Sequence, residues 1–381
     1  MDKRSMGRNG EKVSLLGFGC MRFPVTKDEK IDEIEAEKML DAAYAGGVNY
    51  YDTAWPYHNG TSEAFVGRAM KKYPRDSFYF ATKFPCWAAK TLDDAKRIFN
   101  VQLEHLQTDY VDFYMLHALE KGSWDRMVSL GIVDYFATLL EEGRIKNYGF
   151  SFHDSYEAFE EIASYRDWDF LQIQYNYMDI DEQAGDKGYA LAKKLGIPII
   201  VMEPIKGGNL ASFPQEITSL FTNVRPVGST ASWALRWVAH HDQVKLILSG
   251  MTTMEQVKDN LNTFSPFVPL SPEEESAIVS VREALRKRVN NGCTGCRYCM
   301  PCPYGVDIPA NFSLWNLYGV FQSPGDVMWN WGNAIADDKK AKNCAKCGVC
   351  EEACPQHIEI RRDLAILQVE MDAVYAANKG K

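Results

Sequence analysis

The amino-acid sequence predicts an α/β protein whose larger part is a (β/α)₈ TIM barrel and whose C-terminal part is a small, mainly helical domain. Between residues 13 and 250, short apolar, β-branched or aromatic runs alternate with longer segments of helical period, which is typical of repeated βα units. Eight such units fit into about 260 residues, the usual size of a TIM barrel. Eight of the ten cysteines follow Asn291. The chain therefore divides into a barrel and a cysteine-rich domain.

Each βα unit is predicted from one strand-like run and the helical segment after it. The predicted strands are Leu15–Gly19, Val48–Asp52, Phe78–Lys83, Tyr110–His117, Ile145–Ser151, Phe170–Tyr175, Ile197–Met202 and Val244–Gly250. The predicted helices are Glu35–Ala45, Ser62–Lys72, Leu92–Leu106, Trp124–Glu142, Ser155–Tyr165, Gly188–Leu195, Thr230–His240 and Met254–Asn262.

An open, doubly wound sheet is the alternative architecture. Such a sheet normally contains G-x-G-x-x-G between its first strand and helix, whereas GFGCM at Gly17–Met21 lacks the third glycine. After the last βα unit, the proline-containing segment Phe264–Pro272 is predicted to be a linker ahead of one further helix, Glu273–Arg288. We therefore place the barrel at residues 1–288 and the cysteine-rich domain at residues 289–381.

The composition is that of an ordinary folded protein. The 381 residues include 46% hydrophobic and 24% charged residues, which excludes disordered, collagen-like and coiled-coil chains. The net charge of −9 provides no positive field, so we expect no nucleic-acid partner. No apolar run approaches the length of a membrane helix, and the start MDKRSMGRNGEK is not a secretion signal. We expect a cytoplasmic protein with no membrane partner.

Polar residues end three of the predicted strands, namely Asp52, Lys83 and His117, and Tyr57 follows in the loop after Asp52. Catalytic groups of TIM barrels come from this end of the strands. The ordinary pKa of a tyrosine is about 10, and we expect the neighbouring Lys83 cation to lower it. Asp52 is the natural partner that keeps a partly buried Lys83 charged. An acid, a base and a proton donor at one barrel mouth indicate carbonyl chemistry.

These residues lie within recognisable phrases. The phrases are DTA-x-x-Y…S-E-x-x-x-G from Asp52 to Gly67, T-K at Thr82–Lys83 and L-H at Leu116–His117. In these phrases, and over roughly residues 5–285, the chain resembles the aldo-keto reductases.

The resemblance implies that an aldehyde or ketone is reduced by a nicotinamide hydride. Tyr57 would be the general acid, Lys83 and Asp52 would tune it, and His117 would orient the carbonyl. The substrate would then be a small-molecule carbonyl. The alternative is a nucleotide-binding subunit that senses redox state or transfers electrons without turning over a carbonyl.

The resemblance also implies contacts to NAD(P)H. Nicotinamide ribose would lie against Gly19, Cys20 and Met21, the carboxamide against Ser151 and Gln172, the pyrophosphate against Met202–Leu210 with Pro204, Gly207 and Gly208, and the adenine against Asn260. Paired glycines let backbone amides approach an anion closely. A core polar residue and a simple turn are the structural alternatives for Gln172 and the glycine pair.

Three features depart from the usual pattern of the family. Phe152 replaces the Asn that commonly follows the carboxamide-binding Ser, and Met202 replaces an aromatic residue that stacks on nicotinamide. Many members that prefer NADPH have cations at the positions of Gly250 and Gln256. A 2′-phosphate favours such cations, so their loss indicates that NADH is accepted. Lys258 lies nearby and leaves the preference open.

The C-terminal cysteines form two runs. The first cysteine run, CTGCRYCMPCP, contains Cys293, Cys296, Cys299 and Cys302, and the second cysteine run, CAKCGVCEEACP, contains Cys344, Cys347, Cys350 and Cys354. The spacing C-x₂-C-x₂-C-x₃-C-P binds 4Fe–4S clusters; the second run fits it, and the first is one residue short in its last gap. The region resembles a bacterial two-cluster ferredoxin with about forty extra residues between its halves. We expect two 4Fe–4S clusters.

The ferredoxin resemblance implies crossed ligands. The first three cysteines of each run would share a cluster with the last cysteine of the other run, so that Cys354 joins the first run and Cys302 the second. Zinc is the alternative, because pairs of C-x₂-C also form structural zinc sites. The repeated x₂ spacing and both Cys-Pro endings favour iron–sulfur.

The segment between the cysteine runs is rich in aromatic residues: Phe312, Trp315, Tyr318, Phe321, Trp329 and Trp331. Their spacing favours a packed helix over a platform for a flavin or a protein partner. A hydride transfers two electrons whereas each cluster accepts one, so exchange between the two parts needs a converter such as flavin. The clusters are therefore structural, or they serve an electron-transfer protein or a flavin partner.

Overall fold

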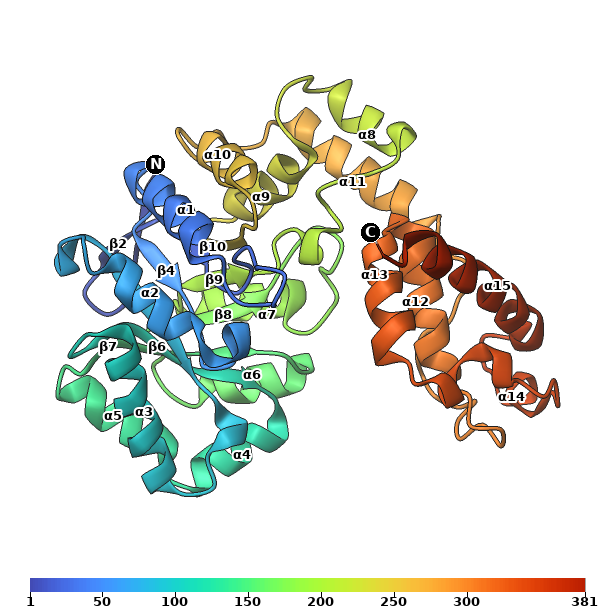
Figure 1. Cartoon of the computed structure of the whole chain (residues 1–381), viewed down its shortest axis with the longest axis horizontal. Coiled ribbons are helices and arrows are strands. Elements are labelled where there is room, and N and C mark those ends of the chain that lie inside the picture. The colour runs from blue at the N-terminus through green and yellow to red at the C-terminus, as the bar shows by residue number, and fades with distance from the viewer. Residues whose placement is uncertain (381) are drawn as a thin grey trace. The chain divides into compact units, whose positions relative to one another are not determined.

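A computed structural model describes residues 1–380 of the chain (Figure 1). The chain forms two compact units, which are described separately. The first unit comprises Met1–Ala211 and Val227–Glu275, and the second comprises Ser212–Pro226 and the chain from Ser276 onward.

The first unit is a closed barrel of eight parallel strands, which confirms the predicted fold class. The strands neighbour one another in the order β10-β3-β4-β5-β6-β7-β8-β9. Their bounds are β3 Leu16–Gly19, β4 Tyr50–Asp52, β5 Tyr79–Phe84, β6 Val111–Leu119, β7 Ile145–Phe152, β8 Phe170–Gln174, β9 Ile199–Met202 and β10 Val244–Gly250. Inward-facing apolar side chains fill the barrel, so its interior is a packed core.

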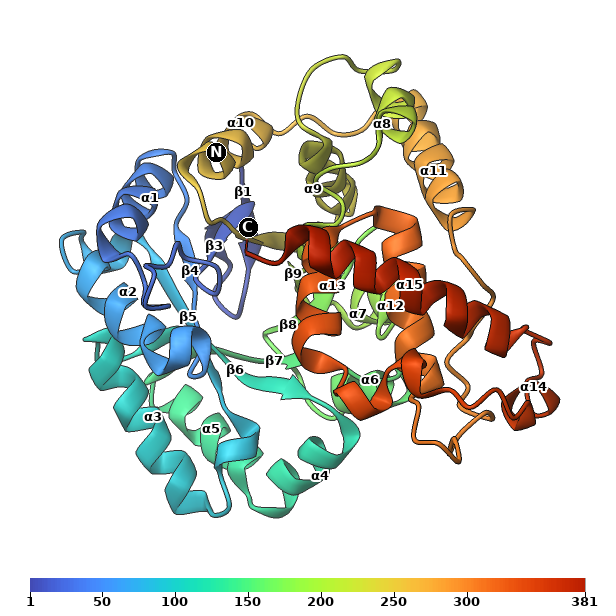
Figure 2. The same cartoon turned by 45° about the vertical axis from the view of Figure 1, so that its right-hand side comes forward.

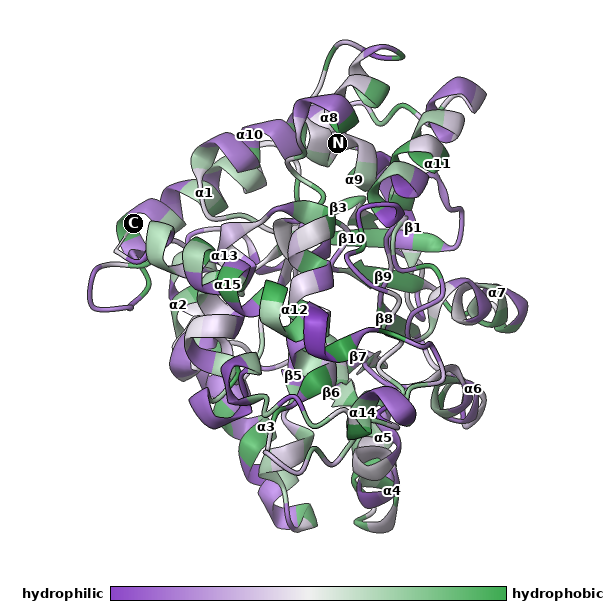
Figure 3. Ribbon diagram, turned by 90° about the vertical axis from the view of Figure 1, so that its right-hand side faces the viewer, coloured by the Kyte–Doolittle hydropathy of each residue, from purple (hydrophilic) through white to green (hydrophobic). Residues whose placement is uncertain are grey.

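Helices surround the strands. Their bounds are α1 Glu33–Ala45, α2 Ser62–Met70, α3 Leu92–Leu106, α4 Lys121–Ser129, α5 Ile132–Glu141, α6 Tyr156–Ser164, α7 Gly185–Leu195, α9 Thr230–His240 and α10 Met254–Thr263. In Figures 1 and 2 the helices α1, α2, α3 and α5 lie outside the barrel strands. Figure 3 shows hydrophobic colouring on strands such as β7 and β9 and mixed colouring on outer helices such as α5 and α7, as expected for amphipathic helices that cover a core.

The single helix predicted over Trp124–Glu142 is wrong. The structure has two helices there, α4 and α5, separated at Gly131. Gly131 has a φ of 68°, in the left-handed region that glycine adopts without steric penalty. The helical period continues across this break, so periodicity alone did not reveal it.

Among the elements that were not predicted are a hairpin and the helix α8. A hairpin of β1 Lys3–Met6 and β2 Glu11–Ser14 precedes the barrel, and α8 Gln215–Thr222 lies in the second unit. Met6 and Val13 of the hairpin are buried in the same apolar cluster as the barrel interior. The hairpin thus contributes to the barrel core rather than to the mouth.

The second unit is mainly helical, as predicted. Its helices are α12 Ile308–Phe321, α13 Pro324–Trp329, α14 Val349–Glu352 and α15 Ile360–Asn378, preceded by α11 Pro272–Arg286, which begins in the first unit. Phe312, Trp315, Phe321 and Trp331 are buried, so these four aromatic residues form packed core, whereas Trp329 is 67% exposed. Along the described chain, no helix is both long and apolar enough to cross a membrane.

Candidate active site and candidate cluster sites

An ion pair lies at the C-terminal ends of two neighbouring strands, β4 and β5. The Lys83 Nζ donates to Asp52 Oδ1 at 2.6 Å and to the Thr53 carbonyl at 2.8 Å. The side chains of Lys83 and Asp52 are only 1% and 4% exposed. Burial alone would lower the pKa of Lys83, but the Asp52 carboxylate and Tyr57 raise it above its ordinary value. The buried ion pair with Asp52 therefore favours the protonated form of Lys83.

Tyr57 begins the short 3₁₀ turn Tyr57–Gly60 that follows β4. The Lys83 Nζ lies 4.9 Å from the centroid of the Tyr57 ring. Burial raises the pKa of Tyr57 above its ordinary value of 10.0, and the nearby Lys83 only partly offsets this rise. Lys83 thus lowers this pKa as expected, but the net shift is upward because the loss of water around the phenol outweighs the charge of the amine.

His117 extends from β6 toward the same group. The His117 and Tyr57 rings are nearly perpendicular, with centroids 6.1 Å apart. Trp87, which the sequence analysis did not single out, has its ring centroid 5.1 Å from that of His117 and is 52% exposed. Burial, reinforced by the positive charge of Lys83, holds the pKa of His117 well below its usual range. The imidazole is thus neutral at pH 7 and available as a hydrogen-bond partner.

A buried hydrogen-bond network supports Lys83 from behind. Gln102 Nε2 donates to the Lys83 carbonyl at 3.0 Å and to Glu63 Oε1 at 2.6 Å. Thr82 Oγ1 donates to the same Glu63 oxygen at 2.5 Å, and the Tyr114 hydroxyl donates to Gln102 Oε1 at 2.7 Å. In the sequence analysis, Glu63 appeared only as part of the motif from Asp52 to Gly67, and this network was not predicted. Its effect is to fix the backbone of β5 beneath the ion pair.

Two further polar side chains lie on the adjacent strands β7 and β8, where Ser151 pairs with Gln172. The Ser151 Oγ accepts from the Ala118 backbone at 2.7 Å, and Gln172 Nε2 lies 3.4 Å from Met202 Sδ. The Gln172 Oε1 is buried and has no hydrogen-bond partner among residues 1–380. A buried amide oxygen without a partner is costly unless a ligand supplies a donor.

The remaining predicted nucleotide contacts occupy strand ends and loops. Gly19 pairs with Gly250 where β3 meets β10. Cys20 is fully buried beside this end, whereas Met21 is 55% exposed.

After β9, the loop that contains Pro204 reaches Gly207 and Gly208, whose φ angles of 65° and 112° favour glycine. No atom lies within 4 Å of a Cβ placed on either of these two glycines. Their backbone is accordingly open to a close ligand.

Helix α10 contains the other two predicted positions. Gln256 Oε1 accepts from the backbone amide of Thr252 at 2.7 Å, so its side chain caps the helix. Asn260 is buried, and its Nδ2 donates to Ser249 Oγ at 2.9 Å. The hydrogen bond to Ser249 therefore fixes the orientation of the Asn260 side-chain amide.

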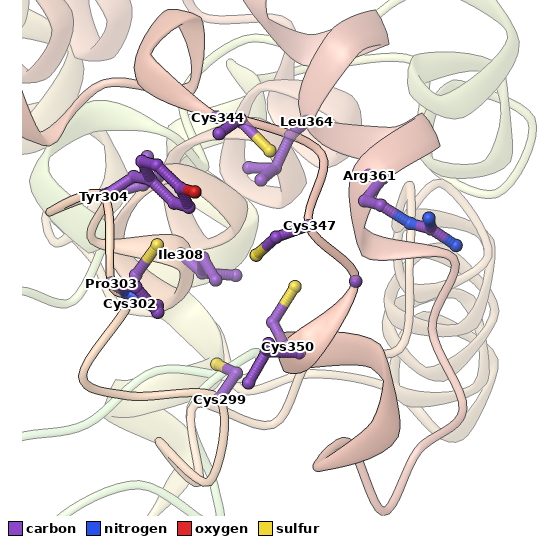
Figure 4. Close-up of a pocket in the computed structure, with 14 residues that line it drawn as sticks. Cys299, Cys302, Pro303, Tyr304, Ile308, Cys344, Cys347, Cys350, Arg361 and Leu364 are labelled. Carbon is purple, nitrogen blue, oxygen red and sulfur yellow. The ribbon is translucent and has the colours of Figure 1, made fainter.

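Two cavities in the second unit are lined by cysteines from both runs. The first cavity is lined by Cys302, Cys344, Cys347, Cys350 and Cys299. The second cavity is lined by Cys293, Cys296, Cys299 and Cys354. Figure 4 shows the sulfur atoms of the first cavity around one space, with Arg361 at its edge. Each cavity thus brings the last cysteine of one run to the first three of the other.

These cavities fit iron–sulfur clusters better than single ions. Within the described residues, no three His, Cys, Asp or Glu side chains are close enough together to hold one metal ion. In a 4Fe–4S cluster each thiolate binds a different iron, so the four sulfurs surround the cluster instead of converging on one atom. All eight C-terminal cysteines are free of disulfides.

The fold and these two groups of side chains indicate an oxidoreductase built on a TIM barrel. The sequence profile of the aldo/keto reductase family matches residues 15–283, and that of a 4Fe-4S dicluster domain matches residues 292–359. The chain belongs to the aldo/keto reductase family, a family of oxidoreductases, and adds a 4Fe-4S dicluster domain to it. Both resemblances found in the sequence are confirmed.

Named relatives cover the barrel. L-galactose dehydrogenase from Arabidopsis thaliana is 24% identical, over 76% of this chain and 96% of that protein. The NADH-specific methylglyoxal reductase of Escherichia coli (strain K12) is 25% identical, over 75% of this chain and 100% of that protein. Probable aldo-keto reductase 1 from Glycine max is 28% identical, over 53% of this chain but only 59% of that protein.

Solved structures agree with the barrel. The holo form of an aldo-keto reductase from Bacillus halodurans superposes with a TM-score of 0.62 at 27% identity, over 74% of this chain and 96% of that one. An aldo-keto reductase from Klebsiella pneumoniae in complex with NADPH gives a TM-score of 0.61 at 22% identity, over 74% and 96% of the two chains, which is a likeness of fold.

Proposed function

We propose that the protein reduces an aldehyde or a ketone with a hydride from NAD(P)H. The observation that supports it most directly is the buried Lys83–Asp52 pair beside Tyr57 and His117 at one end of the barrel. The relative named as a methylglyoxal reductase supports a small carbonyl substrate. The nucleotide supplies the hydride when it is bound, and the side chains supply the proton and the orientation.

Tyr57 holds the proton that the carbonyl oxygen receives. The raised pKa keeps the phenol protonated at neutral pH, and the neighbouring Lys83 stabilises the phenolate that remains after transfer. Asp52 keeps Lys83 charged and in place. A neutral His117 donates a hydrogen bond to the substrate oxygen without competing as a proton source. The half-exposed Trp87 beside His117 is positioned as a wall for the substrate.

The nucleotide is held along the β7–β8–β9 side of the mouth. The unpartnered Gln172 Oε1 accepts from the carboxamide NH₂ group, and Ser151 lies beside it. The loop with Gly207 and Gly208 offers backbone amides to the pyrophosphate. Asn260 meets the adenine from the α10 side.

The C-terminal domain, which we place at residues 289–381 after a barrel domain of 1–288, is proposed to bind two 4Fe–4S clusters with crossed ligands. The cysteine linings of the two cavities support this wiring, with Cys302 on the side of the second run and Cys354 on that of the first. An electron-transfer protein or a flavin carrier is the partner proposed for the clusters, because a hydride cannot pass to a one-electron acceptor directly.

The test is the Tyr57→Phe variant of the anaerobically prepared full chain, assayed with NADH and NADPH against a panel of aldehydes. Because only the proton donor is removed, nucleotide affinity should persist while kcat/KM falls by about two to four orders of magnitude. Tyr165→Phe, at a tyrosine that is 49% exposed on the barrel surface, is the matched control and should retain wild-type rates.

Retention of wild-type kcat by Tyr57→Phe would contradict the role of the tyrosine. Tight nucleotide binding by the wild-type protein with no turnover of any carbonyl would instead support the alternative, an electron-transfer or redox-sensing subunit. Iron analysis should give about eight iron atoms per chain. Stoichiometric zinc without iron would contradict the cluster assignment.

A further inference from the structure

Arg22 lies against Gly250, although the two residues are far apart in the sequence. Arg22 follows the end of β3, and its neighbour strand β10 ends at Gly250. A Cβ placed on Gly250 would lie 2.7 Å from Arg22 Cγ and 3.1 Å from Arg22 Cβ. Thr252 Oγ1 also donates to the Arg22 carbonyl at 2.9 Å. The stem of Arg22 therefore occupies the space in which a side chain at position 250 would begin.

The charge of Arg22 is not used by the fold. Arg22 is exposed, and its guanidinium makes no recorded ion pair or hydrogen bond with any residue in the 1–380 range. By contrast, the exposed Arg68 pairs with the carboxylate of Glu33. A fork of donors without a carboxylate partner is suited to a phosphate.

Several backbone donors at the start of helix α10 are already paired. Gln256 Oε1 accepts from the amides of Thr252 and Thr253, and Thr253 Oγ1 accepts from the amide of Gln256. This capping box pairs the amides of Thr253 and Gln256, and Glu255 adds a negative charge to the first turn of the helix. A cation on another element would therefore strengthen the binding of an anion near the α10 start.

We infer that Arg22 supplies the positive charge for the adenosine 2′-phosphate of NADPH. Its stem lies over Gly250, at one of the two positions where the family resemblance expects a cation, and Gln256, at the other position, is used as a helix cap. The inference rests on the proposed function, because it requires a nicotinamide nucleotide at this mouth. One cation in place of two makes the protein accept both NADPH and NADH.

The test compares ligands that differ only in the 2′-phosphate. Adenosine 2′,5′-bisphosphate and 5′-AMP, and then NADPH and NADH, are titrated calorimetrically into the anaerobic full chain. Arg22→Met keeps the apolar stem over Gly250 and removes the charge. We expect the affinity for the two 2′-phosphorylated ligands to fall about tenfold or more, while that for 5′-AMP and NADH changes by less than about twofold.

Three further variants sharpen the test. Arg22→Lys should recover part of the lost affinity, because the charge returns without the fork. Gly250→Ala should displace Arg22 and cause the same selective loss. Lys258→Met is the control for a neighbouring exposed cation and should change no affinity more than about twofold.

Each remaining outcome overturns something definite. If Arg22→Met loses affinity equally for both members of each ligand pair, Arg22 contacts the pyrophosphate or supports the fold. If Arg22→Met loses no affinity, or if Lys258→Met shows the selective loss instead, Arg22 does not bind the 2′-phosphate. Any of these results overturns this inference alone. A wild-type protein that binds none of the four ligands would overturn the nucleotide site and this inference together.

Discussion

Replacing Lys83 by methionine removes the cation of the buried ion pair and keeps a side chain of similar length. The pair is 1% and 4% exposed, so water cannot replace the lost partner. Asp52 Oδ2 already has no partner among the residues that the structure describes, and the variant leaves Oδ1 without one as well. Removing one partner of a buried pair costs about 3–5 kcal/mol. We expect the unfolding free energy of the barrel to fall by this amount at pH 8.

The cost should depend on pH in one direction. Burial raises the pKa of Asp52, and in Lys83→Met the opposing charge of the lysine is absent. The folded variant then binds a proton that the unfolded chain releases, so its stability decreases as the pH rises above the ordinary aspartate range. Urea unfolding followed by circular dichroism at pH 5 and pH 8 should therefore show the larger deficit at pH 8.

Two comparisons make this prediction refutable. Lys96→Met breaks an exposed pair with Asp93, at 48% and 87% exposure, and should cost at most about 1 kcal/mol. The double variant Asp52→Asn/Lys83→Met buries no charge and should be more stable than Lys83→Met at pH 8. The reasoning fails if Lys83→Met costs no more than the exposed control. It also fails if the cost of the double variant equals the sum of the costs of Lys83→Met and Asp52→Asn measured alone.

Other expectations concern the clusters, the helix packing and the nucleotide. With crossed ligands, Cys302→Ser should reduce the iron content from about eight to about four atoms per chain. Adding Cys347→Ser should remove no further iron, because Cys302 and Cys347 line the same cavity. Further loss of iron in the double variant would contradict the crossing. Gly67→Ala should lower the unfolding free energy by about 1–3 kcal/mol, because the new Cβ would lie 2.4 Å from the His105 carbonyl oxygen. The control Gly122→Ala should not destabilise the protein, because a Cβ at that position meets no atom within 4 Å. Steady-state reduction should proceed with NADH at least comparably to NADPH, and a preference for NADPH of about a hundredfold would contradict this.

Much of the barrel could be read from local sequence. Each strand is a short apolar run and each helix has its own apolar period, so the eight strands appear at the predicted places, with β10 at the predicted bounds of Val244–Gly250. The helix α3 also has its predicted bounds, Leu92–Leu106, and begins with a capping box at Thr91. The cysteine spacing is equally local. Such features depend on residues within about ten positions of one another.

Other features depend on residues that chain closure brings together. Arg22 lies against Gly250 because β3 pairs with β10 across the seam of the barrel. The pKa of Tyr57 rises because folding removes water from the phenol. The residues next to Tyr57 in the sequence do not reveal this burial. The network of Glu63 and Gln102 likewise joins α2 to α3 behind β5. Local pattern encodes which elements form, whereas burial and contacts between distant segments set the charge state and the partners of each side chain at the site.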